Sequence, residues 1–64
     1  MKLEDVKKNL NKIVRYKDST GIYRLTGCIL RKKGTRYYHQ AELTDEKHGK
    51  SLIICKLDEV GAIE

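Results

Sequence analysis

The segment "IYRLTGCILRKKGTRYYHQAEL", residues 22–43, decides the fold of this chain. Its second half alternates regularly, and one side of the extended chain there carries Tyr37, His39, Ala41 and Leu43. Its first half, residues 22–31, is another run rich in apolar residues, and the polar "RKKG" between the halves is typical of a turn. The segment therefore predicts two long antiparallel strands joined by a hairpin.

Gly27 interrupts the first of these strands. Tyr23 and Leu25 share one face before it, whereas after it either Cys28 with Leu30 or Ile29 alone points inward. A glycine inside a strand often marks a β-bulge or a barrel corner, because it has no Cβ to obstruct the neighbouring backbone. We therefore expect the strand to bend at Gly27.

The flanking residues predict one helix and further strands. Leu3, Val6 and Leu10 are spaced by three and four, as on one side of a helix, so we expect a helix over about residues 3–10. The period then becomes two, which predicts strands at residues 13–16 and 51–57. The C-terminal "DEVGAIE" fits one turn of 3₁₀ helix and a last short strand around residues 62–63.

These elements predict a single small domain, residues 1–64, of the mainly β (α+β) class. A short N-terminal helix would accompany a strongly bent, five-stranded antiparallel barrel over about residues 12–64. We expect Tyr37 to join the core and Tyr38 to face outward. The other expected core residues are Leu10, Val14, Leu25, Ala41, Leu43, Ile53, Cys55, Leu57 and Val60.

The layout "LNKIVRY…GIYRLTGCIL…GKSLIICKLDEV" resembles that of the SH3-like and Sm-like small β-barrels. The resemblance covers nearly the whole chain and implies five bent strands after a short helix. Sm-like proteins carry an Asp and an Asn after the second strand to hold a base, whereas this chain reads "RKKGTRYYHQ" there. An Sm-type uridine pocket is therefore not implied.

The chain also resembles short uncharacterised proteins, of a domain of unknown function, from mobile elements of Gram-positive bacteria. The words that carry this resemblance are "LTGCI", "YHQAEL" and "ICKLDEV", in that order. It implies a genetic setting but no biochemical activity.

Size and charge limit the functions that the chain can have. A domain of 64 residues buries only about 60% of its unfolded surface, so a homo-oligomer is possible. The longest apolar run, Ser51–Cys55, is far too short to span a membrane, and we expect a cytoplasmic protein. The net charge is +5, with +8 in residues 1–40 and −3 in residues 41–64. This asymmetry favours an anionic partner.

The basic hairpin supports more than one interpretation. In the first, the protein is a non-catalytic module that contacts DNA or RNA through phosphates, while Tyr38 stacks on a base. In the second, the hairpin is a solvated turn whose charges only prevent aggregation. In the third, the protein is an SH3-like adaptor for a peptide or a larger assembly, and the acidic C-terminal third and the tyrosines Tyr16, Tyr23 and Tyr38 matter more. The residues expected at the nucleic-acid site are Arg15, Arg24, Arg31, Lys32, Lys33, Arg36 and Tyr38.

Other chemistry has little support in the sequence. Cys28, His39, His48 and Cys55 are potential zinc ligands, but no two of them have the short spacing of a closed zinc site. Both cysteines lie in apolar runs, which is typical of reduced, buried thiols. No phosphate-binding glycine loop is present, so we expect neither an enzyme nor a cofactor.

Overall fold

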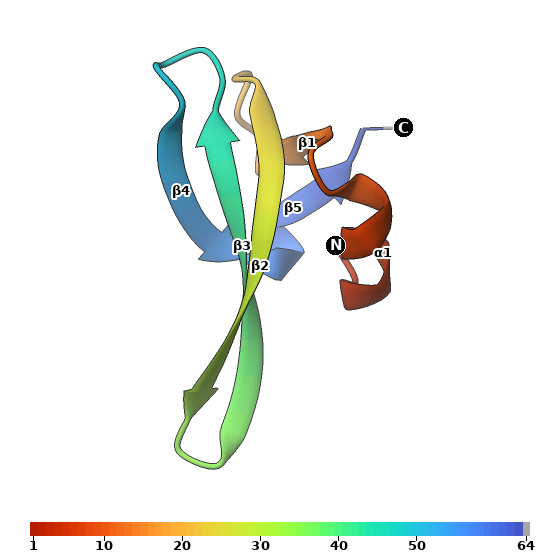
Figure 1. The fold of residues 1–64 in the computed structure, drawn as a ribbon, viewed down its shortest axis with the longest axis vertical. Helices are drawn as coiled ribbons and strands as arrows, with labels where there is room; N and C mark the ends of the chain where they lie inside the picture. The colour runs from red at the N-terminus through yellow and green to blue at the C-terminus, as the bar shows by residue number, and fades with distance from the viewer. Residues whose placement is uncertain (64) are drawn as a thin grey trace.

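The computed structural model of the chain describes residues 1–63. It is mainly β, with one short helix and one five-stranded antiparallel sheet in the order β4-β3-β2-β1-β5 (Figure 1). The elements in chain order are α1 (Leu3–Asn9), β1 (Ile13–Tyr16), β2 (Tyr23–Lys33), β3 (Arg36–Asp45), β4 (Ser51–Lys56), the 3₁₀ turn η1 (Leu57–Glu59) and β5 (Val60–Ala62). The predicted element types and order are thus confirmed, with most boundaries within two residues.

The sheet is open rather than closed. The strands β4 and β5 form its two edges, and within residues 1–63 they are joined only through η1 and not by a ladder of hydrogen bonds. The predicted barrel is therefore confirmed only as a five-stranded antiparallel sheet.

A β-bulge lies where Gly27 predicted a bend. Leu25 is opposite Leu43 but Gly27 is opposite Glu42, so Thr26 is an extra residue in β2. Its hydroxyl donates hydrogen bonds to the Glu42 carbonyl at 3.1 Å and to Oε1 of the Glu42 carboxylate at 3.2 Å. An extra residue of this kind bends a strand and increases its twist.

The hairpin of β2 and β3 extends well beyond the rest of the sheet. The last pair between β3 and β4 is Gln40 with Lys56, and β1 pairs with β2 only at the opposite end of β2. Residues 30–39, which we call the arm, therefore contain two strands and no third. The arm makes the molecule 37 Å long but only 23 Å and 20 Å in the other directions (Figure 1).

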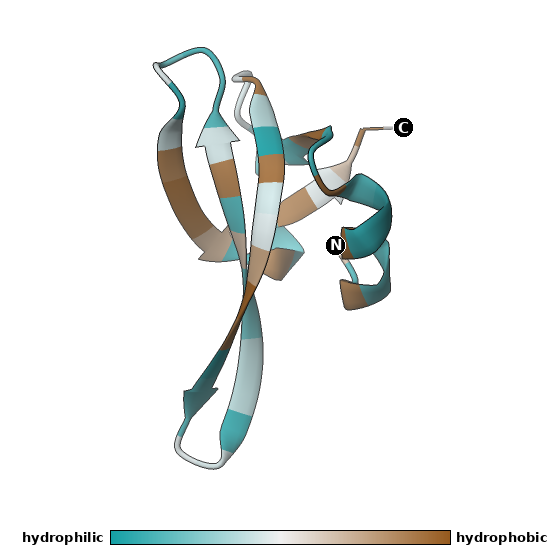
Figure 2. Ribbon diagram, viewed as in Figure 1, coloured by the Kyte–Doolittle hydropathy of each residue, from teal (hydrophilic) through white to brown (hydrophobic). Residues whose placement is uncertain are grey.

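The turn of the arm depends on Gly34. Lys33 pairs with Arg36, which leaves a two-residue loop, and Gly34 at its first position has φ +63°. A glycine with positive φ at that position alone is the pattern of a type II′ turn, whose twist matches that of the two strands. The arm is thus a regular hairpin, hydrophilic at its tip (Figure 2).

The core lies between the inner face of the sheet, α1 and η1. Seven of the expected core residues are buried: Val14, Leu25, Ala41, Leu43, Cys55, Leu57 and Val60. Val6 of α1 and Tyr23 of β2 are buried as well, and the Tyr23 ring meets the Tyr16 ring edge-on at 5.2 Å between centroids.

Two expected core positions, Leu10 and Tyr37, are wrong, and a third, Ile53, is confirmed only in part. Leu10 is 41% exposed, because α1 ends at Asn9 and the backbone of Leu10 already leaves the helical region. Ile53 is only partly buried against the core. Tyr37 is 64% exposed, because it lies on the arm, beyond the end of the core.

Candidate nucleic-acid interface

The arm carries four of the predicted cations on two different faces. Residues directly opposite each other in an antiparallel pair point to the same face of a sheet. The inner face continues from Cys28 and Ala41, both packed in or against the core, to the pair of Lys32 and Tyr37. The outer face carries the pair of Arg31 with Tyr38 and then the pair of Lys33 with Arg36.

The four arm cations are exposed and are not neutralised by carboxylates. Every residue from Arg31 to Tyr38 is exposed. Within residues 1–63, none of the ion pairs involves an arm residue. The arm holds four Lys or Arg and no Asp or Glu, and so contributes +4 to the chain's net charge of +5. Nearly all the excess positive charge therefore lies on the arm.

Two contacts orient side chains along the arm. The guanidinium Nε of Arg31 donates a hydrogen bond to Oε1 of Gln40 on the outer face. On the inner face, Nζ of Lys32 lies 5.6 Å from the centroid of the Tyr37 ring, within the range of a cation–π contact. One face of the Tyr37 ring is therefore occupied by a cation of the arm itself.

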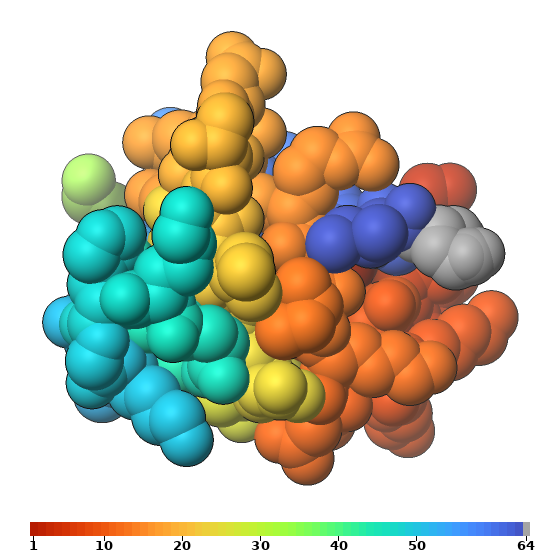
Figure 3. Space-filling view, turned by 90° about the horizontal axis from the view of Figure 1, so that it is seen from above, coloured from red at the N-terminus to blue at the C-terminus, as the bar shows by residue number. Residues whose placement is uncertain are grey.

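Arg24 lies far from the arm. It is about seven residues from Arg31 along β2, which corresponds to roughly 20 Å. Its side chain is engaged locally, since Nη1 donates to the Asn11 carbonyl and Nε lies 3.6 Å from Oε1 of Glu46. At this end of the molecule the turn after β3 lies beside the start of β2 (Figure 3), where the Glu46 amide donates to the Ile22 carbonyl.

Arg15 also lies outside the arm. It pairs with Gly61 of β5, and its Nη2 donates to the Ala62 carbonyl at 3.1 Å. A small pocket beside it is lined by both basic and acidic residues, among them Lys17, Asp18 and Glu59. The structure thus brings together five of the seven predicted site residues, namely Arg31, Lys32, Lys33, Arg36 and Tyr38.

The carboxylates Asp45 and Glu46 lie at the end of β3 opposite the arm. The hydrogen bond from the Thr44 hydroxyl lowers the pKa of Glu46; burial opposes this effect and the charge of Arg24 adds to it. At Asp45, burial raises the pKa, but hydrogen bonds from His48 and from the Lys47 amide outweigh it and lower the pKa overall. Both carboxylates therefore remain negative to lower pH than usual, and the cations Arg24 and Lys50 lie near them at the same end.

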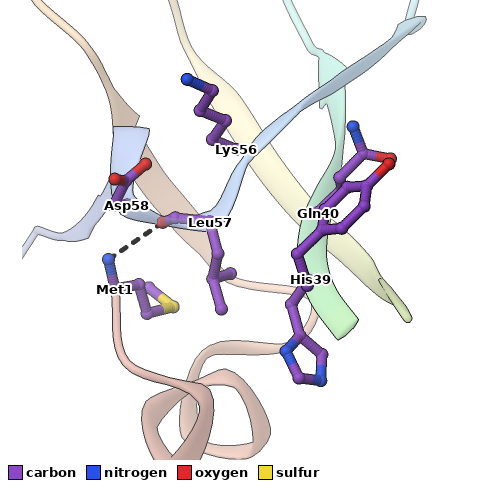
Figure 4. Close-up of a pocket in the computed structure, with 7 residues that line it drawn as sticks. Met1, His39, Gln40, Lys56, Leu57 and Asp58 are labelled. Atoms are coloured by element: carbon purple, nitrogen blue, oxygen red, sulfur yellow. Dashed lines mark hydrogen bonds between the residues drawn. The ribbon is translucent and has the colours of Figure 1, made fainter. Parts of the chain in front are cut away.

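An open pocket of about 530 Å³ lies at the base of the arm. Figure 4 shows His39 and Gln40 leaving β3 in opposite directions, with Leu57 and Asp58 of η1 across from them. The Met1 ammonium beside it donates hydrogen bonds to the carbonyls of Leu57 and Val60. Basic, acidic and apolar groups line this pocket together, so it does not extend the positive surface.

The potential zinc ligands are dispersed. Cys28 and Cys55 lie on β2 and β4 with Ala41 of β3 between them, and burial raises the pKa of the Cys55 thiol. His48 is in the turn after β3, where its Nδ1 lies 3.0 Å from Oδ2 of Asp45. Within residues 1–63, no three His, Cys, Asp or Glu side chains gather as a metal site would require.

Sequence reasoning missed two residues of the site: Tyr37 as an exposed ring of the arm, and Gln40, just beyond the arm, as the partner of Arg31. The exposure of Tyr37 follows from the unequal lengths of β3 and β4. Because β3 has ten residues and β4 only six, the start of β3 extends past the sheet and its inner face has nothing to pack against. No comparable signal in the sequence indicates Gln40.

Known proteins give no indication of the function of this chain. No protein-family model, curated protein or solved structure matches the chain. Over residues 1–63, α1 is the one α-helix, and at seven residues it is too short to cross a bilayer.

Proposed function

We propose that this protein is a non-catalytic module that binds nucleic acid through the arm, with limited sequence specificity. One observation carries the proposal: four exposed cations, without carboxylate partners in residues 1–63, are concentrated on a projecting hairpin. Cations in this arrangement bind phosphates and release the counterions condensed on them, which favours association.

Tyr38 supplements the cations. It is 42% exposed on the outer face, opposite Arg31. Its ring offers a stacking surface for an unpaired base, worth about 1–3 kcal/mol, and its hydroxyl offers a hydrogen bond to a phosphate. Arg15 and Arg24 have backbone or carboxylate partners elsewhere, so we assign them a structural role instead.

The layout supports a binding module of the SH3-like kind. A meander of four strands is followed by a 3₁₀ turn, after which β5 returns beside β1. This order resembles that of the small SH3-like barrels, which offer a groove or an open strand edge to a binding partner.

A pair of charge-matched triple variants tests the proposal. Lys32→Ala/Lys33→Ala/Arg36→Ala removes three arm cations, whereas Lys7→Ala/Lys8→Ala/Lys47→Ala removes three exposed cations outside the arm. Fluorescence anisotropy with labelled oligonucleotides at 50 mM salt should show at least tenfold weaker binding for the arm variant and nearly unchanged binding for the control.

Circular dichroism of both variants verifies that the fold is retained. Equal losses in the two variants would mean that binding follows net charge and not the arm. If the wild type binds neither DNA nor RNA at 50 mM salt, the proposal is wrong and the arm is only a solvated hairpin.

A protein-binding adaptor is the second candidate, and the free edge of β4 favours it. Leu52 and Ile54 on the outer face of this strand are 65% and 45% exposed. An edge strand of this kind can accept an extended peptide as an additional strand. In a pull-down from nuclease-treated cell extract, this candidate predicts that the wild-type protein retains a partner protein. The Leu52→Lys/Ile54→Lys variant should no longer retain that partner, whereas the Lys32→Ala/Lys33→Ala/Arg36→Ala variant should still retain it. If only the Lys32→Ala/Lys33→Ala/Arg36→Ala variant lost the partner protein, the β4 edge would be excluded as the binding site.

A further inference from the structure

The geometry points to a specific ligand for the arm: we propose that it enters the major groove of double-stranded DNA. This inference rests on the proposed function, and it selects duplex DNA over single strands and over double-stranded RNA. The dimensions of the arm, the distribution of its charges and the placement of its tyrosines each support it.

The arm has the size of a groove-binding ribbon. Its strands extend roughly 15 Å beyond the sheet at about 3.3 Å per residue, which exceeds the depth of the major groove, about 8.5 Å. The major groove, about 12 Å wide, admits a two-stranded β-ribbon without deformation of the duplex. The minor groove is only about 6 Å wide, so a ribbon enters it only where the DNA is bent and the groove is opened.

The charges of the arm suit a ligand that surrounds it. Arg31, Lys33 and Arg36 lie on the outer face and Lys32 on the inner face. A groove has a phosphate backbone along each of its two walls, so the cations on both faces of the arm can contact phosphates at the same time. A single strand lying along one face would leave the cations of the other face unused.

The tyrosines argue against a stacking platform for single strands. Tyr37 and Tyr38 are on opposite faces, so they cannot stack on successive bases of one strand. The Tyr37 ring is also covered on one side by Lys32 Nζ at 5.6 Å. In a groove, Tyr38, which lies opposite Arg31 on the outer face, can instead donate its hydroxyl to a phosphate.

Double-stranded RNA fits the arm less well. Its A-form major groove is deep and narrow, and its minor groove is shallow and lined by hydroxyl groups. The A-form major groove is too narrow for side chains to reach its floor, and the shallow minor groove does not place phosphates on both sides of an inserted ribbon. Binding should therefore distinguish the two kinds of duplex.

Three labelled ligands of one 20-nucleotide sequence test the inference: duplex DNA, single-stranded DNA and duplex RNA. We expect the 64-residue chain to bind duplex DNA at least tenfold more tightly than either of the others at the same salt concentration. Dimethyl sulfate then locates the protein, because guanine N7 lies in the major groove and adenine N3 in the minor groove.

At saturating protein, guanine N7 should be protected and adenine N3 should remain reactive. The Lys32→Ala/Lys33→Ala/Arg36→Ala variant should lose this protection, and the Lys7→Ala/Lys8→Ala/Lys47→Ala control should keep it. Equal affinity for single strands or for duplex RNA, or protection of adenine N3 alone, would overturn the inference while leaving nucleic-acid binding intact. Absence of binding to all three ligands would overturn the proposed function itself.

Discussion

At the scale of single residues, two glycines in or near β2 differ in what surrounds them. A Cβ on Gly21 would lie 2.6 Å from the hydroxyl oxygen of Tyr23 and 2.8 Å from its Cζ atom. That ring is buried, and its hydroxyl shares a hydrogen bond of 2.6 Å with Ser19. A Cβ on Gly27 would lie 2.8 Å from Oε1 of Glu42, at the far end of a flexible side chain, and at an ordinary contact distance of 3.7 Å from the Cβ of Glu42.

The substitutions should therefore have unequal costs. Gly21→Ala forces a packed ring to move and should lower the free energy of unfolding by about 1–3 kcal/mol. Gly27→Ala displaces a carboxylate and weakens the Thr26 bond to it, which should cost less than about 1 kcal/mol. Urea denaturation of both variants measures the difference, and a larger loss for Gly27→Ala would contradict this account of the two sites.

Because the pKa of Glu46 is lowered in the folded chain, the free energy of unfolding should decrease at acidic pH. A carboxyl whose pKa is lower in the folded chain stabilises the fold above its unfolded pKa, near 4.5, and loses that contribution as the pH falls through the folded value. The urea midpoint of the wild type should therefore fall between about pH 5 and pH 3. Glu46→Gln should show a smaller fall, whereas Glu4→Gln on the exposed side of α1 should behave as wild type. An identical fall in all three proteins would remove Glu46 from the explanation.

At the scale of elements, the arm and the sheet should differ in stability. Two strands without a covering layer are at best marginally stable, whereas β3 beyond Gln40 is paired on both sides. We expect amide hydrogens of residues 31–38 to exchange at least about 100-fold faster than the amide of Leu43 under native conditions. Native-state hydrogen exchange measures this directly. Equal protection in the two regions would mean that arm and sheet unfold as one unit.

The elements also show how far the sequence alone predicts the structure. The period-two pattern of residues 37–44 and Gly27 were sufficient to predict the hairpin and its bulge. The "RKKG" turn was predicted too early, because residues 31–33 belong to β2 and the loop consists of residues 34–35. The alternation of side chains along a strand, however, indicates only which face of the sheet a residue occupies. It does not indicate whether another element packs against that face. Tyr37 lies on the face of the core residues and is nevertheless exposed, because β4 ends before it can be covered.

The same limit applies to the candidate site. Arg31, Lys32, Lys33 and Arg36 are neighbours in sequence, so a hairpin brings them together whatever the rest of the chain does. Arg15 and Arg24 depended on how separate strands associate, which residue patterns do not specify. Their partners, the Ala62 carbonyl and Glu46, are respectively 47 residues and 22 residues away along the chain.

At the scale of the whole molecule, the excess positive charge is concentrated at one end of the long axis. The arm carries +4 of the net +5, whereas at the opposite end of β3 the carboxylates Asp45 and Glu46 are offset by Arg24, Lys47 and Lys50. This uneven distribution orients the protein as it approaches a polyanion, arm first, and increases the rate of productive encounter. It also predicts that association will weaken as added salt screens the arm.

The dependence of DNA affinity on salt tests the central claim most directly. If the four arm cations bind four phosphates, a plot of the logarithm of the association constant against the logarithm of the salt concentration should have a slope of about −3.6. The association constant should then fall roughly 150-fold between 50 and 200 mM salt. The Lys32→Ala/Lys33→Ala/Arg36→Ala variant retains only Arg31 and should show a slope near about −0.9. A slope that stays the same in this variant would contradict the claim that the arm binds the phosphates.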